Sequence, residues 1–266
     1  IDEIDATPTG YQTIVLDADG NQTATLVASG SNRKYVTIDE IPLYLQQAFV
    51  AIEDERFYEH NGVDLKGILR AGMKGIASGH FSEGASTITQ QLLKNTVFTE
   101  WTSESSMADK FERKFQEQYL AIQLEKKVDK NWILENYLNA INLGQNTLGV
   151  GVASERYFGK DVSDLTLSEC AVLAAITQNP SKYNPITNPD ENAKRRSKVL
   201  NNMLDQGYIS QAEYDEAIAD DVYDRIQLVN VETEDDNINS YFVDELTDQV
   251  IEALVDKLGY TETQAY

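Results

Sequence analysis

Two stretches of the sequence carry side chains that could do chemistry. The first, A-I-E-D-E-R-F-Y-E-H-N-G, covers residues 51–62 and opens with the carboxylates of Glu53 and Asp54. The second, G-A-S-T-I-T-Q-Q, covers residues 84–91 and offers hydroxyl and amide groups without charge. Together they suit a reaction that needs a proton acceptor and several neutral hydrogen bonds to a polar substrate.

Glu53 falls on a helix face that should be apolar. The sequence predicts a helix that begins near Thr37 or Asp39, and Leu45, Phe49 and Glu53 follow one another at four-residue spacing. Burial disfavours the charged form of a carboxylate, so a carboxylate in this position is suited to accept a proton near neutral pH. Alternatively, the end of the helix turns Glu53 to the surface. The spacing alone leaves both possibilities open.

Taken together, the two stretches resemble the first two signature motifs of the peptidoglycan glycosyltransferases, family 51 of the glycosyltransferases. The first motif, E-D-x-x-F-x-x-H-x-G, is matched from Glu53 to Gly62, and the second, G-x-S-T-I-T-Q-Q, from Gly84 to Gln91. In this family the domain is the membrane-proximal part of bifunctional class A penicillin-binding proteins. The order and separation of the motifs make the resemblance specific.

Three later segments resemble the remaining motifs of the family. R-K-x-x-E is matched by Arg113, Lys114 and Glu117, although in isolation Arg113 and Glu117 would be an ordinary i,i+4 pair on a surface helix. K-x-x-I-L-E-x-Y-L-N covers residues 130–139, and its apolar spacing predicts a core helix. The fifth motif, R-x-x-V-L-x-x-M, is matched by Arg196, Val199, Leu200 and Met203.

The sequence departs from the family at one position. The family usually has an Arg shortly before the third motif, where this chain has Met107-Ala108-Asp109-Lys110. Lys110 is the candidate substitute, but an ammonium group lacks the bidentate geometry of a guanidinium.

The resemblance implies an inverting sugar transfer. The 4-hydroxyl of one lipid-linked disaccharide (lipid II) attacks the anomeric carbon of the growing glycan and expels a polyprenyl pyrophosphate. Glu53 is the expected base and Glu117 the second catalytic carboxylate, which would orient the pyrophosphate side or hold Mg²⁺ or Mn²⁺. The other residues expected to bind substrate are Asp54, Ser86, Thr87, Gln90, Gln91, Lys94, Lys110, Arg113, Lys114 and Arg196.

The net charge of the chain limits the classes of partner that it can bind. The chain has 266 residues, with 22 basic against 44 acidic side chains, a net charge of −22. This charge argues against nucleic acid, and contact with an anionic membrane requires a local basic patch. Residues 61–83 supply one in an amphipathic segment that we expect to be mobile: Leu65, Leu69 and Met73 repeat every four residues beside Lys66, Arg70 and Lys74. The alternative is that these basic residues form an ordinary solvated helix face.

The predicted fold is mainly α, since strand patterns occur only near the N-terminus. The resemblance implies a lysozyme-like domain with a large helical lobe and a small mobile lobe. We expect a β lead-in over residues 1–36, the glycosyltransferase domain over 37–223, and an acidic linker towards an absent transpeptidase domain over 224–266. The family also implies attachment to the outer face of the bacterial cytoplasmic membrane through an N-terminal anchor that is not in this sequence, and inhibition by phosphoglycolipids.

Two other functional classes remain. One is a lysozyme-like hydrolase, because paired carboxylates also serve glycan hydrolysis. The other is a non-catalytic scaffold that only binds glycan or lipid, which would be expected if the motif carboxylates were missing. Both carboxylates are present, and the cations near the third motif favour a phosphorylated donor.

Overall fold

The computed structural model describes residues 5–27, 32–70, 86–98, 107–229 and 241–258. The chain divides into two compact units, residues 1–9 with 33–230 and residues 10–32 with 231–266. Among the described helices, none combines the length and the apolar composition needed to cross a membrane.

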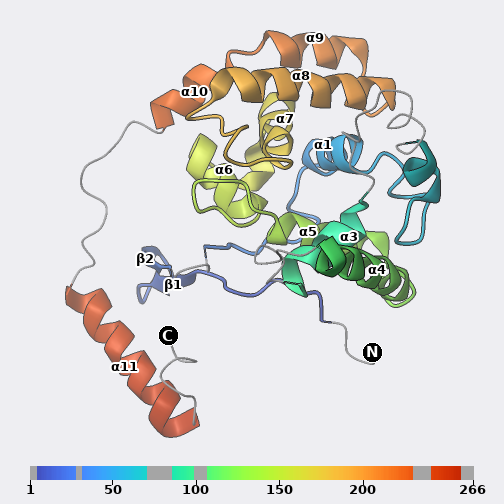
Figure 1. Cartoon of the computed structure of the whole chain (residues 1–266). Coiled ribbons are helices and arrows are strands. Elements are labelled where there is room, and N and C mark those ends of the chain that lie inside the picture. Colours follow the sequence, from blue (N-terminus) through green and yellow to red (C-terminus); the bar gives the residue numbers. More distant parts are fainter. Residues whose placement is uncertain (1–4, 28–31, 71–85, 99–106, 230–240, 259–266) are drawn as a thin grey trace. The chain divides into compact units, whose positions relative to one another are not determined.

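The first unit is helical, which confirms the predicted mainly α fold (Figure 1). Its elements are α1 (Leu43–Glu53), α3 (Ile88–Thr96), α4 (Met107–Leu124), α5 (Lys130–Ala140), α6 (Val150–Phe158), the 3-10 turn η2 (Val162–Asp164), α7 (Leu167–Ile176), α8 (Pro189–Asp205), α9 (Gln211–Ala219) and α10 (Val222–Val229).

Helix α7 is the centre of the core. Every residue from Ser168 to Ile176 is buried, and α1 and α8 both pack against it. The helix begins with a capping box, in which Thr166 and Glu169 bond each other's backbone amides. An almost wholly apolar helix such as this one has to be surrounded by other helices. It thereby holds the ends of α1 and α8 side by side.

Helix α1 begins at Leu43, later than the sequence suggested. Thr37 does not cap it, because the amide and hydroxyl of Thr37 donate instead to the Glu40 carboxylate, each at 2.7 Å, in a separate turn. The helix starts directly after Pro42, whose ring fixes its own φ angle and which has no N–H to donate. Leu45 and Phe49 lie in the core as predicted.

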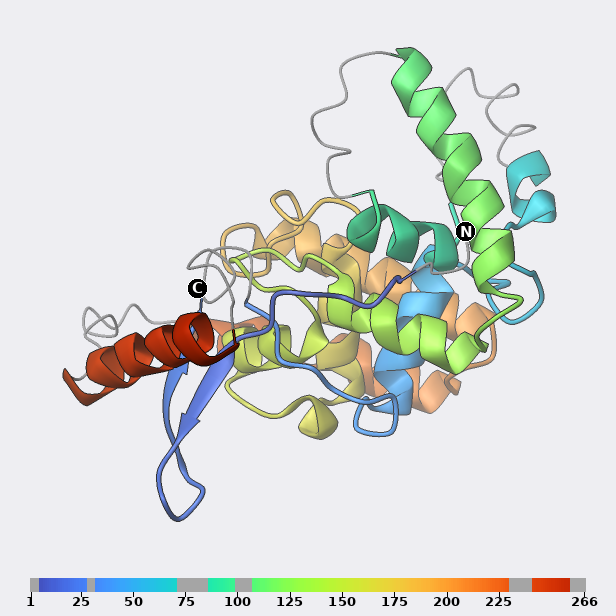
Figure 2. The ribbon, with the colours of Figure 1, turned by 90° about the horizontal axis from the view of Figure 1, so that it is seen from below.

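Helices α3, α4 and α5 form the other part of this unit, with α3 packed against both of the others. Figure 2 shows α4, in green, extending away from the body of the unit at its N-terminal end. The second unit contains a hairpin of β1 (Thr13–Leu16) and β2 (Gln22–Leu26), paired antiparallel from Thr13 with Leu26, and helix α11 (Tyr241–Leu258).

Candidate active site

Glu53 is the last residue of α1, and its side chain is 13% exposed. Three side chains donate to its carboxylate. Thr177 donates its hydroxyl to Oε1, Gln91 donates Nε2 to Oε2 at 3.1 Å, and Arg195 Nη2 lies 3.4 Å from Oε1. The sequence left open whether Glu53 is buried or turned to the surface, and in the structure it is partly buried. Its carboxylate is held by donors from three elements and still reaches the surface.

Asp54 fastens the end of α1 to the start of α3. Its carboxylate accepts from His60 Nε2 at 2.9 and 3.0 Å and from the amide of Ile88 at 2.9 Å. His60 Nδ1 accepts from the amide of Gly62 at 3.2 Å, so Nε2 carries the proton donated to Asp54. The Asp54 side chain is only 3% exposed. These contacts engage its oxygens in positioning Glu53 and α3, and the substrate contact expected for Asp54 stays a prediction.

Thr87 and Gln90 also build the scaffold. They form a capping box at the start of α3, and the Thr87 hydroxyl donates to the carbonyl of Gly62 at 2.7 Å. Both residues are buried, and their expected role in substrate binding stays a prediction. Gly62 has φ +92°, and a Cβ there would lie 2.6 Å from the carbonyl of Ala121. Glycine is thus required where the two motifs meet.

Gln91 does face Glu53, and the fourth motif orients it. The buried Tyr137 donates its hydroxyl to Gln91 Oε1 at 3.3 Å, which leaves the Gln91 amide nitrogen for Glu53. Burial, reinforced by the charge of Glu53, raises the pKa of Tyr137, so the phenol stays protonated and donates. The sequence predicted a core helix here; the structure adds a role in orienting the amide.

A second cluster surrounds Glu117, which is fully buried. Arg113 donates to Oε1, and Lys114 Nζ lies 2.7 Å from Oε2 and 3.1 Å from the hydroxyl of Ser86. The Lys114 side chain is 42% exposed, so its ammonium group can also meet a ligand. A buried carboxylate held between two cations fixes the positions of both.

Lys94 on α3 lies within electrostatic reach of both carboxylates. Its pKa is lowered, first by burial and next by the charge of Lys114, while Glu117 and Glu53 act in the opposite direction. The cluster contains three cations, Lys94, Arg113 and Lys114, and one carboxylate, Glu117. Its side chains therefore carry a surplus of two positive charges. Because desolvation weakens the charged form of Lys94, an anionic ligand would be the natural partner for it.

The residues around Glu117 do not fit the metal site that the resemblance suggested. Both carboxylate oxygens already accept from Arg113 and Lys114, and Lys94 adds a further positive charge nearby. Mg²⁺ requires oxygen ligands with negative charge to spare. Within the described ranges, no group of three His, Cys, Asp or Glu side chains is placed to hold a metal ion. The side chain of Lys110 lies outside the described residues.

The fifth motif contributes packing contacts within the helical unit. Arg196 is buried and donates to the hydroxyl of Ser168 at 2.9 Å and to the carbonyl of Ala217. Its neighbour Arg195 is the residue that reaches Glu53, and it also donates to Gln178 at 2.7 Å. The two arginines face different neighbours because one step along a helix turns the side chain by about 100° to another face. The substrate contact expected for Arg196 stays a prediction.

The sequence is similar to that of several known proteins. The family model described as transglycosylase matches residues 19–204. The chain is 47% identical over 200 residues to penicillin-binding protein 1F of Bacillus subtilis, covering 75% of this chain and 27% of that protein. It is 46% identical over 204 residues to penicillin-binding protein 1A of Escherichia coli, covering 76% of this chain and 23% of that protein.

The chain spans about a quarter of the length of these two relatives. A solved structure of penicillin-binding protein 1A from Haemophilus influenzae aligns over 92% of this chain and 24% of its own, at 24% identity and a TM-score of 0.47. The family assignment rests on the sequence matches, since the transglycosylase model covers well over half of the chain. The chain therefore belongs to the transglycosylase family, the peptidoglycan glycosyltransferases.

Proposed function

We propose that this chain polymerises lipid II into β-1,4-linked glycan strands and releases undecaprenyl pyrophosphate, with inversion at the anomeric carbon. The observation that carries the proposal is the pairing of a fixed, partly exposed carboxylate, Glu53, with a cation cluster of Lys94, Arg113 and Lys114. A base and an anion site are the two requirements of a sugar transfer from a pyrophosphate donor.

In this mechanism Glu53 takes the proton of the attacking 4-hydroxyl as the new bond from oxygen to the anomeric carbon forms. The bond from that carbon to the pyrophosphate oxygen breaks, and the leaving pyrophosphate meets the cation cluster. Thr177, Gln91 and Arg195 hold the carboxylate at the end of α1. Preorganised charges at the leaving group supply catalysis without rearrangement during the step.

Incubation of the chain with lipid II tests this proposal against hydrolysis. Polymerisation yields longer glycan and free undecaprenyl pyrophosphate, while a lysozyme-like hydrolase would release new reducing ends from finished glycan. The surplus of positive charge beside Glu117 favours the transferase, because a hydrolase acting on glycan has no phosphate to bind. Release of reducing ends without glycan growth would refute the proposal.

We propose further that the enzyme works at the outer surface of the cytoplasmic membrane, where its polyprenyl-linked substrates lie. Residues 65–70 are helical, and Leu65 and Leu69 are 73% and 69% exposed. Arg70 is exposed and pairs with Glu55 at 3.0 Å. Met73 and Lys74, the remaining members of the predicted stripe, lie outside the described residues. Exposed leucines beside basic side chains favour docking to an anionic membrane surface.

Reversing the charge of this stripe should weaken membrane binding. The triple change Lys66→Glu, Arg70→Glu, Lys74→Glu should remove binding to anionic vesicles, since each basic residue contributes about 1 kcal/mol there. Turnover should fall much more on vesicle-embedded than on detergent-solubilised lipid II. A matched control reverses Lys126, Lys127 and Lys198, and equal slowing of the stripe variant in both formats would refute docking.

The Thr177 hydroxyl should matter to turnover through its hydrogen bond to Glu53. Thr177→Val keeps the size of the side chain but leaves one carboxylate oxygen with only the Arg195 contact. We expect kcat to fall by about 10- to 100-fold with KM little changed, because a net hydrogen bond to a charged group is worth about 1.5–3 kcal/mol. Thr177→Ser should restore most of the rate. A variant with unchanged kcat, or one not rescued by Ser, would contradict this role.

A further inference from the structure

A cavity of about 890 Å³ lies in the first unit, away from Glu53 and from the cation cluster. It is lined by Tyr44 of α1, by the segment 158–169, by α9 and by the start of α10. Tyr44 is near the beginning of α1 and Glu53 at its end, so the helix rise alone separates them by roughly 13 Å. A volume of this size is typical of ligand sites, which commonly span about 300–1,000 Å³.

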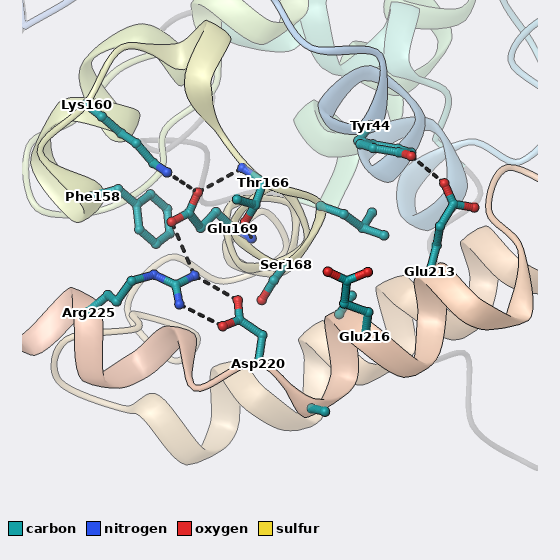
Figure 3. A pocket seen from close by; sticks show the side chains of 13 residues that line it. Tyr44, Phe158, Lys160, Thr166, Ser168, Glu169, Glu213, Glu216, Asp220 and Arg225 are labelled. Atoms are coloured by element: carbon teal, nitrogen blue, oxygen red, sulfur yellow. Dashed lines mark hydrogen bonds and ion pairs between the residues drawn. The ribbon is translucent and has the colours of Figure 1, made fainter.

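One end of the cavity is electrically balanced. Lys160 Nζ lies 2.7 Å from Glu169, and Arg225 makes two contacts of 2.7 Å with Asp220 and one of 3.3 Å with Glu169 (Figure 3). Two cations and two carboxylates thus neutralise one another. Because both cations are engaged, this end offers no free positive charge to an anionic ligand.

The opposite end is negative. Glu213 and Glu216 are three residues apart on α9, and both carboxylates face the cavity in Figure 3. Glu213 accepts from the Tyr44 hydroxyl at 2.5 Å and from Ser210, which lowers its pKa to about 2. Glu216 is exposed, and its carboxylate has no hydrogen bond or ion pair to another described residue. The end of the cavity at α9 therefore carries two carboxylates that have no cationic partner among the described residues.

Part of the cavity lining is apolar. Phe158 is 7% exposed, Ala217 is 4% exposed, and Leu167 packs against the core. An aliphatic stem could lie along this surface while a charged group at its tip reaches Glu216. Lysine and arginine side chains have this shape and charge.

We infer that this cavity binds a lysine or arginine side chain presented by a segment of another protein, with the cationic group between Glu213 and Glu216. Charge complementarity selects this occupant. Phosphates and acidic peptides would meet two uncompensated carboxylates, and the segment 230–240 of this chain is itself acidic. The site is separate from the transferase chemistry, so its binding can be measured without turnover.

The probe is the capped peptide Ala-Leu-Arg-Leu-Ala, titrated into the ¹⁵N-labelled chain and followed by amide chemical shifts. We expect saturable shifts at the cavity lining, including Tyr44, Ser168 and Ala217, and none with the peptide that carries Gln in place of Arg. Glu216→Lys should weaken binding by about tenfold or more, because attraction becomes repulsion. Polymerisation by this variant should stay unchanged.

The matched control is Asp215→Lys, which makes the same charge change on the same helix at an exposed residue outside the cavity. It should weaken binding by less than about twofold, because the Asp215 side chain does not line the cavity and solvent screens its charge from a ligand there. Equal weakening in both variants would show general attraction to an acidic surface and overturn the inference. Absence of saturable shifts at the lining, equal binding of the Gln peptide, or stronger competition by spermidine than by the peptide would overturn it too.

Discussion

Replacing Glu53 with Gln should lower the rate of lipid II polymerisation by about 10²–10⁴-fold, the usual cost of losing a positioned base. The amide has nearly the same shape and can still accept from Thr177, so the fold should be kept. It cannot take the proton of the attacking hydroxyl. Since the cation cluster is untouched, binding of a phosphoglycolipid inhibitor of the moenomycin type should remain within a few-fold of the original.

Glu55→Gln provides the control for this experiment. Glu55 follows closely in the sequence and carries the same charge, but it pairs with Arg70 and Arg56 rather than facing the Glu53 cluster. It should keep most of the activity in detergent. Retention of more than roughly a tenth of the original turnover by the Glu53 variant, against the 10²-fold loss expected for a base, would remove Glu53 from that role.

The sequence predicted the helical fold because its motifs coincide with strong local signals. The capping boxes at Thr166 and Ser210 and the apolar stripe of residues 130–139 each depend only on neighbours along the chain. The start of α1 was placed too early, because Thr37 has a competing partner in Glu40. The spacing of apolar residues does not reveal this kind of local competition for a hydrogen bond.

The candidate site was harder to predict, because its contacts join distant parts of the chain. Thr177 and Arg195 were missed, since neither stands out in local sequence and both reach Glu53 only through the packing of α1, α7 and α8. The scaffold contacts of Asp54 and Thr87 were equally hard to predict, because a polar residue in a motif can serve chemistry or scaffold. Their burial, which accompanies these contacts, follows from tertiary packing.

A divalent cation was expected at Glu117 for a similar reason. The sequence shows a carboxylate near the anion site but does not show that Arg113 and Lys114 both occupy it. This geometry makes Glu117 a clamp for cations. If Glu117 acts as a clamp, we expect the position of the cations, rather than their total charge, to govern binding of the pyrophosphate.

Glu117→Gln tests this clamp. The substitution keeps the size of the side chain and raises the net positive charge of the cluster, but the amide group turns a donor towards either Arg113 or Lys114. That cation then loses its fixed position, so we expect kcat to fall by about 10²–10³-fold, as for loss of one preorganised donor at a developing charge. Inhibitor affinity should fall as well, unlike in the Glu53 variant. Calorimetric titration with the phosphoglycolipid and single-turnover rates separate the two effects.

Glu125→Gln is the matched control, because Glu125 is a second buried carboxylate, bonded to Lys130 at 2.8 Å and to Thr89 at 2.5 Å. Breaking a buried ion pair typically costs about 3–5 kcal/mol of stability, so both variants should unfold at lower temperature. Both variants should lose stability, but only the Glu117 variant should also lose affinity for the phosphoglycolipid inhibitor. If its affinity for the phosphoglycolipid instead increases, total charge outweighs cation position, and Glu117 serves the site in some way other than as a clamp.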